Sequence, residues 1–182
     1  MKAPILPRSI VALMLKHVCV ALAAVLAASP ASAGELFGGL FVHDVKTPLD
    51  KSGLEGGMDV QLGFRGGKIG RTPLRPYIFG ALNTAGNTNY AAVGVSAKFG
   101  DKIYIRPGFG LAVHTGSAAD YYRYDKIAFG SRILFEPEVA VGARVNDRLS
   151  VEASWVHMSH ATLFSDENPG IDNLGVRLNL KL

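Results

Sequence analysis

From residue 34 onward, apolar and polar side chains alternate with a period of two along most of the chain. The last twelve residues show this most clearly, because one parity is apolar throughout: Leu174, Val176, Leu178, Leu180 and Leu182. Successive side chains of a strand point to opposite faces, so the alternation predicts strands with one apolar face. No part of this region shows the 3.6-residue period of an amphipathic helix. The pattern predicts eight strands, of which the first and third alternate poorly: residues 35–44, 57–66, 74–83, 89–99, 102–114, 130–145, 148–159 and 171–182.

The polar faces of these strands indicate which side of the sheet lies inside. They carry many glycines and several charged side chains: Arg106, Glu136, Glu138, Arg144, Arg177 and Lys181. Such a face suits a narrow interior filled with ion pairs, and the apolar face then suits lipid. The predicted strands are 10–16 residues long, enough to cross a bilayer when tilted. We therefore expect an all-β fold, an eight-stranded antiparallel up-and-down transmembrane β-barrel. A soluble, lipocalin-like barrel with its apolar face inward is the alternative.

The connections between the strands favour the membrane barrel. Gly100-Asp101 and Asn146-Asp147 are tight-turn sequences that fall at one end of an up-and-down barrel. At the other end the connections are mostly longer, with 84–88 as the short exception: 45–56, 115–129 and 160–170. Outer-membrane barrels keep short turns in the periplasm and long loops outside. The connection at 66–73 is longer than this scheme expects.

Residues 1–33 have the composition of a secretory signal peptide. They contain Lys2, Arg8 and Lys16 but no acidic residue, then the apolar run Val18–Ala28, then Ala-Ser-Ala at 31–33. The apolar run is too short to span a bilayer. We expect cleavage before Gly34 and export through this N-terminal signal peptide. With no repeat or linker downstream, residues 34–182 are predicted to form a single barrel domain.

Removal of the predicted signal peptide would change the charge and composition of the chain. The three basic residues of the signal peptide account for most of the net charge of +4. The remaining 149 residues hold 16 basic and 15 acidic side chains and no cysteine. Without a basic excess, a nucleic-acid-binding function is excluded. Without cysteine, disulfide scaffolds and thiol nucleophiles are excluded as well. All 21 glycines lie in the mature part, 14% of its residues, about twice the average.

The apolar parity of the strand predicted at 148–159 ends in two polar residues. His157 and Ser159 follow Trp155 on the parity that faces lipid. Side chains at i and i+2 of a strand point the same way, so the imidazole and the hydroxyl can meet. Asp172 opens the next strand and can reach back to His157. A hydroxyl, an imidazole and a carboxylate are the groups of a nucleophile, a general base and an orienting acid. A histidine and a serine merely solvated at the level of the headgroups are the alternative.

A longer motif surrounds these residues. The chain reads Trp-Val-His-Met-Ser-His-Ala at 155–161 and Asn-Pro-Gly-Ile-Asp at 168–172. This combination resembles the lipid A 3-O-deacylase family (PagL-type), whose members are eight-stranded outer-membrane barrels. The resemblance is sharp over about 152–182 and rests upstream on architecture, signal peptide and strand number. At two positions the chain departs from the family pattern: His160 stands where asparagine is common, and Asp172 stands where a glutamate is expected.

The resemblance implies roles for the site residues. Ser159 would be the nucleophile, His157 the general base and Asp172 the orienting acid. Asn168 and His160 would support the oxyanion site or the shape of the loop. No cofactor is implied. His157 and His160 do not share a face of a strand, so we expect no zinc site. His43 and His114 are expected to make ordinary hydrogen bonds at the rim or in the interior.

The expected activity is that of a carboxylic ester hydrolase. The resemblance implies a serine esterase of the bacterial outer membrane that removes the 3-O-linked 3-hydroxyacyl chain from lipid A of lipopolysaccharide. Its partners would be lipid A and the lipid of the outer membrane, and the sequence leaves open whether the barrel forms a homodimer. Two alternatives remain at this point: a non-enzymatic structural barrel, and a phospholipase that uses the same residues. A porin is disfavoured because eight strands enclose an interior that side chains just fill.

Overall fold

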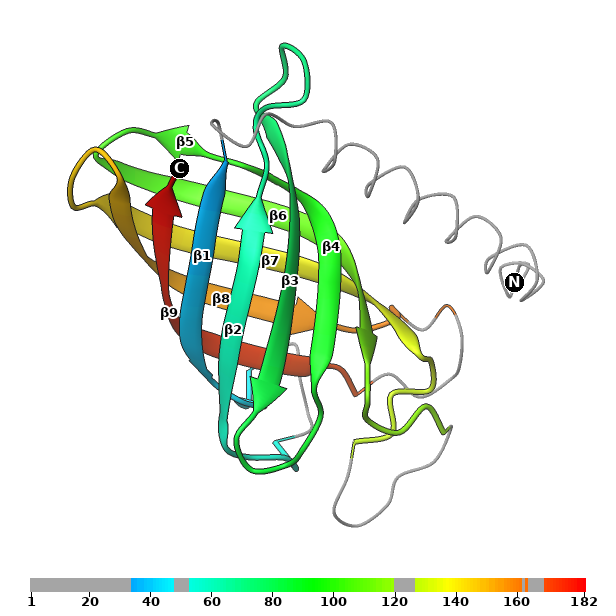
Figure 1. Ribbon diagram of the computed structural model, residues 1–182. Coiled ribbons are helices and arrows are strands. Elements are labelled where there is room, and N and C mark those ends of the chain that lie inside the picture. Colours follow the sequence, from blue (N-terminus) through cyan, green and yellow to red (C-terminus); the bar gives the residue numbers. More distant parts are fainter. Residues whose placement is uncertain (1–33, 48–52, 120–126, 162, 164–168) are drawn as a thin grey trace.

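The computed structural model describes residues 34–47, 53–119, 127–161, 163 and 169–182. These residues form one antiparallel sheet that curls into a barrel (Figure 1). Neighbouring strands pair in the order β4-β3-β2-β1-β9-β8-β7-β6-β5, and β4 also pairs with β6, which closes the barrel. The strands are β1 (Glu35–Val42), β2 (Met58–Arg65), β3 (Leu74–Asn83), β4 (Tyr90–Ala97), β5 (Phe99–Gly100), β6 (Ile103–His114), β7 (Ile133–Arg144), β8 (Leu149–Met158) and β9 (Ile171–Lys181).

The segments β4 and β5 are two parts of one pass along the barrel. Ser96 pairs with Gly108 and Phe99 pairs with Ile105, so the register continues across the gap. The gap lies opposite Pro107, which has no N–H to donate to the ladder. The nine segments therefore make eight passes, and the predicted eight-stranded antiparallel barrel is confirmed.

Most predicted strand limits agree with the structure within one or two residues. The largest differences lie next to residues with positive φ angles. β1 ends at Val42 because Asp44 has a φ of 53°, and β7 begins only at Ile133, after Gly130 with a φ of 68°. An extended strand cannot continue through such a backbone conformation.

The two ends of the barrel differ, as the connection lengths predict. The turn end holds Gly34, Leu182 and the connections 66–73, 101–102 and 145–148. The loop end holds the connection 84–89 and the described parts of the connections that follow β1, β6 and β8. The part of the chain that the structure describes contains no helix long and apolar enough to span a membrane. The predicted signal peptide, residues 1–33, lies outside the described residues and stays a prediction.

The outward surface of the barrel is apolar. Large apolar side chains stand there with about half or more of their surface exposed, among them Leu40, Leu62, Leu82, Ile103, Phe109, Val141, Val176 and Leu178. In water, so large an exposed apolar area would be unfavourable, whereas lipid solvates it. The soluble alternative, which needs this face inside, is therefore wrong.

The lumen is filled with aromatic and charged side chains. Phe37, Phe41, Tyr77 and Phe79 point inward from β1 and β3 and are almost fully buried. Apolar residues on both faces explain why these two strands alternate poorly in the sequence. The guanidinium of Arg177 lies 4.8 Å from the centroid of the Phe37 ring, so the charged and aromatic groups pack against each other.

Ion pairs link the inward faces of distant strands. Arg177 Nη2 donates to Glu138 at 2.9 Å, and Arg106 Nε lies 2.8 Å from Glu152. Of the six charged residues predicted to line the interior, four are buried: Arg106, Glu136, Glu138 and Arg177. Arg144 and Lys181 lie on the same inward parity but are exposed, because they end β7 and β9 at the rim.

Glycines on the inward face make room for these large side chains. A Cβ on Gly94 would lie 2.4 Å from the Tyr77 ring, and one on Gly142 would lie 2.3 Å from the Tyr104 ring. Neither distance is compatible with a methyl group. Small residues opposite large ones therefore fill a narrow lumen without overlap, which gives a packing reason for the high glycine content.

Candidate active site

The β8–β9 ladder places His157 directly opposite Asp172 near the loop end. Both residues lie on the outward parity of their strands, with Trp155 and Leu174 as the next outward pair. His157 Nδ1 is 2.7 Å from Asp172 Oδ1, and His157 Nε2 is 3.0 Å from Ser159 Oγ. The three predicted side chains thus form one continuous hydrogen-bonded chain. Because a carboxylate can only accept, Nδ1 carries the proton and Nε2 accepts from the hydroxyl.

The backbone of Ser159 is fixed by β7. Its N–H donates to Phe135 O at 3.1 Å, and its carbonyl accepts from Phe135 N at 2.8 Å. Ser159 lies one residue beyond the end of β8, and its side chain is half-buried. The pairing holds the hydroxyl at the edge of the outward surface. It also engages the N–H of Ser159, so this group is not an oxyanion donor in this conformation.

The carboxylate of Asp172 is enclosed although it faces outward. Its exposed fraction is 0%, whereas Leu174 and Val176 on the same face of β9 are 40% and 55% exposed. Trp155 Nε1 donates to Asp172 Oδ1 at 2.9 Å, and the Thr47 hydroxyl donates to Oδ2. The backbone N–H of Val45 donates to Asp172 O at 2.7 Å, which fixes the β1–β2 connection against β9. Donors on both oxygens stabilise an ionised carboxylate away from water.

Gly170 brings the chain close to the imidazole. It has a φ of 69°, and a Cβ at this position would lie 3.0 Å from His157 Cε1. Both the left-handed backbone and the close approach favour glycine. The Pro-Gly of the 168–172 motif thus ends the loop directly beside His157.

Buried charges hold together several connections at the same end. Glu55 accepts hydrogen bonds from the N–H groups of Thr88 at 2.9 Å and Ile127 at 3.4 Å, and lies 3.2 Å from His43 Nε2. His43 Nδ1 is 2.9 Å from the Asp59 carboxylate. Burial alone would lower the pKa of His43, but its bonds to Asp59 and Glu55 raise it to about 9. Burial alone would raise the pKa of Glu55, but the bonds from His43, Thr88 and Ile127 lower it to about 2.

The other predicted site residues are placed differently. Asn168 lies outside the described residues. His160 follows Ser159 and is fully buried. His114 Nε2 lies 2.8 Å from Ser131 O, an ordinary structural contact. Among the described residues, no group of three or more His, Cys, Asp or Glu side chains could hold a metal ion.

Two residues of the site were not identified as such from the sequence. Trp155 precedes His157 on the lipid-facing parity of the sequence, but its hydrogen bond to Asp172 follows only from the β8–β9 register. Thr47 lies 125 residues before Asp172, in a connection whose course no local pattern predicts. No sequence signal would have joined these two residues.

The fold and this arrangement define an outer-membrane β-barrel with hydrogen-bonded Ser, His and Asp side chains on its outward surface. The family model of lipid A 3-O-deacylase (PagL) matches residues 52–181, more than half of the chain. The protein belongs to this family, and its fold is that of a bacterial outer-membrane protein.

Solved structures share the barrel at low sequence identity. The outer membrane enzyme PagL has a TM-score of 0.59 and 19% identity, covering 81% of this chain and 99% of that one. Neisserial surface protein A has a TM-score of 0.53 and 12% identity, covering 82% and 97%. The N-terminal β-barrel domain of Pseudomonas aeruginosa OprF has a TM-score of 0.50 and 10% identity, covering 81% and 98%. No curated protein matches the chain significantly. At these identities the structural likenesses show the fold alone.

Proposed function

We propose that this protein is a serine esterase that removes the 3-O-linked 3-hydroxyacyl chain from lipid A in the outer leaflet. The observation that carries the proposal is the continuous chain from Asp172 through His157 to Ser159 on the outward surface near the loop end. Family membership supports lipid A as the substrate and the 3-O ester as the bond that is cleaved.

The first half of the reaction forms an acyl-enzyme. Ser159 Oγ attacks the carbonyl carbon of the ester while His157 Nε2 takes the hydroxyl proton. Asp172 holds the imidazole in the required tautomer and stabilises the imidazolium. The tetrahedral intermediate then collapses, and His157 returns the proton to the departing 3-hydroxyl of the sugar.

The second half releases the fatty acid. Water enters, His157 accepts one of its protons, and the resulting hydroxide attacks the acyl carbon bound to Ser159. Collapse of this second intermediate frees a 3-hydroxy fatty acid and restores the serine hydroxyl with the proton from His157. These steps use only side chains of this protein and water.

The location of the site suits a substrate that is itself a membrane lipid. The hydroxyl and imidazole lie on the face that carries Leu174 and Val176, which lipid covers. Lipid A can therefore reach Ser159 by lateral diffusion, without leaving the bilayer. The enclosure of Asp172 by Trp155 and Thr47 keeps the charged member of the chain away from acyl chains.

A donor other than the Ser159 N–H must stabilise the oxyanion, because that group pairs with Phe135. Asn168, two residues before Gly170, is our candidate, since Gly170 lies beside His157. Replacing Asn168 with Ala should then lower the rate by about 10²–10³-fold while the barrel still folds.

Mass spectrometry of lipid A incubated with the detergent-folded protein tests the proposal. The wild type should remove one 3-hydroxyacyl chain, and Ser159→Ala should remove none while keeping its β circular dichroism. The same assay with phospholipid vesicles covers the phospholipase alternative, whose product lacks the 3-hydroxyl. Unchanged lipid A with a well-folded wild type, or full activity of Ser159→Ala, would contradict the proposal.

A further inference from the structure

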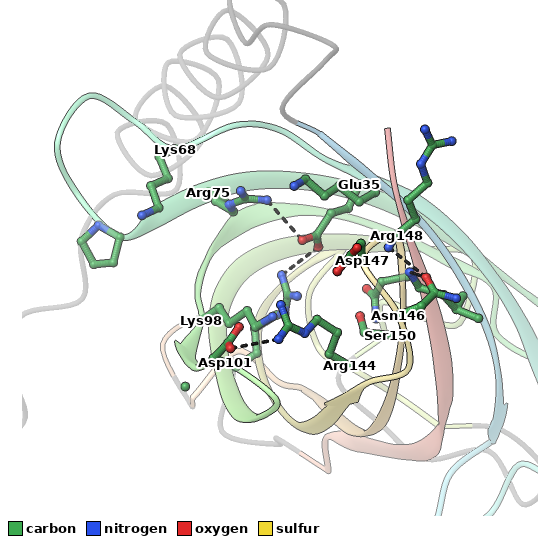
Figure 2. A pocket seen from close by; sticks show the side chains of 16 residues that line it. Glu35, Lys68, Arg75, Lys98, Asp101, Arg144, Asn146, Asp147, Arg148 and Ser150 are labelled. Atoms are coloured by element: carbon green, nitrogen blue, oxygen red, sulfur yellow. Dashed lines mark hydrogen bonds and ion pairs between the residues drawn. The ribbon is translucent and has the colours of Figure 1, made fainter.

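A cavity of about 340 Å³ opens at the turn end of the barrel (Figure 2). The candidate active site lies at the other end. Seven basic side chains line it but only three acidic ones, Glu35, Asp101 and Asp147. The mature chain as a whole has almost equal numbers of basic and acidic side chains. The positive charge is therefore concentrated at this rim and is not a general property of the molecule.

The acidic groups of the rim neutralise only part of this charge. Glu35 lies 3.2 Å from Arg75 and 3.1 Å from Arg106, and Asp101 lies 3.0 Å from Arg144. The other four basic residues form no ion pair within the described part of the chain: Lys68, Lys98, Arg148 and Lys181. They come from four different segments, so the barrel itself brings these like charges together.

Arg106 adds a buried donor to the cavity wall. Its side chain is 1% exposed, and its Nη2 atom has no hydrogen-bond partner among the described residues. A buried guanidinium N–H without an acceptor is unfavourable unless a ligand or water completes it. In Figure 2, Lys68 and Arg75 lie on one side of the opening and Lys98 and Arg144 on the other.

We propose that this cavity binds a phosphate group, as a free phosphate ester or as the headgroup of an inner-leaflet phospholipid. Guanidinium and ammonium groups from several directions suit the oxygens of a tetrahedral dianion better than those of a single carboxylate. A volume near 340 Å³ is at the lower end for small-molecule sites, which fits a headgroup-sized ligand. The site is separate from the ester-hydrolysing residues at the loop end.

Isothermal titration calorimetry tests whether the cavity binds a free phosphate ester. The full barrel, folded in a maltoside detergent that lacks phosphate, is titrated with glycerol 3-phosphate at low salt. Binding should saturate, and Lys68→Gln/Lys98→Gln should raise the Kd at least tenfold. Lys102→Gln is the matched control, because Lys102 is an exposed lysine at the same end that does not line the cavity. Its Kd should equal that of the wild type.

Native mass spectrometry with phosphatidylglycerol tests the lipid source, with the same variants. Binding in either experiment that is lost in the double variant and kept in the control supports the site and identifies the source. Absence of binding in both, or equal weakening in Lys102→Gln, overturns it. Ser159→Ala should bind phosphate normally and the double variant should keep its esterase activity, so this proposal and the proposed function fail independently.

Discussion

Asp172 lies directly across the β8–β9 ladder from His157, with its Oδ1 atom 2.7 Å from His157 Nδ1. Opposed residues of antiparallel strands have Cβ atoms about 4.5–5.5 Å apart. A carboxylate with a single methylene therefore reaches the imidazole without distortion. The register thus allows an aspartate to contact His157 where the family resemblance leads one to expect the longer glutamate.

Replacing Asp172 should strongly lower the rate of lipid A deacylation, whether the substitution changes the charge or the length of the side chain. Asp172→Asn should lower kcat roughly 10³–10⁴-fold, because the amide favours the wrong imidazole tautomer. Asp172→Glu should also lower kcat, because a longer side chain would displace the carboxylate from the hydrogen bonds that Trp155 and Thr47 donate to it. Rates of lipid A deacylation with barrels of equal β content measure both. Near wild-type activity of Asp172→Asn would remove Asp172 from the mechanism.

Trp155 should act on the reaction through Asp172. Trp155→Phe keeps an aromatic ring but removes the 2.9 Å hydrogen bond to Oδ1. Loss of a hydrogen bond to a charged group is worth about 1.5–3 kcal/mol, so kcat should fall at least about tenfold while KM changes little. A purely interfacial role would leave kcat unchanged and alter only the stability of the folded barrel.

Thr47 should hold the second oxygen of the same carboxylate. Thr47→Val has nearly the same shape without the hydroxyl and should lower kcat several-fold, whereas Thr47→Ser keeps the donor and should restore most of it. Comparing the two variants separates the hydrogen bond from packing of the β1–β2 connection. Equal kcat values for Thr47→Val and Thr47→Ser would show that the hydroxyl of Thr47 does not position Asp172.

The juxtaposition of His157, Ser159 and Asp172 was predictable because these residues are local in the strand pattern. His157 and Ser159 are two residues apart on one face, and Asp172 opens the strand that pairs with theirs. The eight strands that cross the barrel were predictable for the same reason, because the sequence alternates with a period of two wherever the inward side chains are polar. It fails in β1 and β3, whose inward Phe37, Tyr77 and Phe79 make both faces apolar.

Contacts between distant segments were not predictable from one sequence. Thr47 meets Asp172, and Glu55 meets Thr88 and Ile127, only after the barrel has closed and its connections have folded over the end. The same holds for the break between β4 and β5, which depends on Pro107 in the neighbouring strand.

Inward glycines should be intolerant of even a methyl group. At Gly94 a Cβ would lie 2.4 Å from the Tyr77 ring and 2.6 Å from Phe109 O, so Gly94→Ala should destabilise the barrel by about 1–3 kcal/mol. Gly80 is the matched control, because a Cβ there meets nothing within 4 Å. Urea unfolding in micelles measures both variants. Similar stabilities for the two would contradict the packing account of the lumen.

The His43 cluster should make the stability of the barrel depend on pH above neutrality. The pKa of His43 in the folded protein is about 9, above its ordinary value of 6.5, because Asp59 and Glu55 hold the proton despite burial. The stabilisation is therefore complete below pH 6.5 and is lost as the pH rises through 9. At about 1.4 kcal/mol per pKa unit it amounts to at most about 3.5 kcal/mol. The difference in unfolding free energy between wild type and His43→Gln should shrink from pH 6 to pH 10. NMR titration of the His43 ring should give a midpoint near 9, and a midpoint near 6.5 would refute the charged cluster.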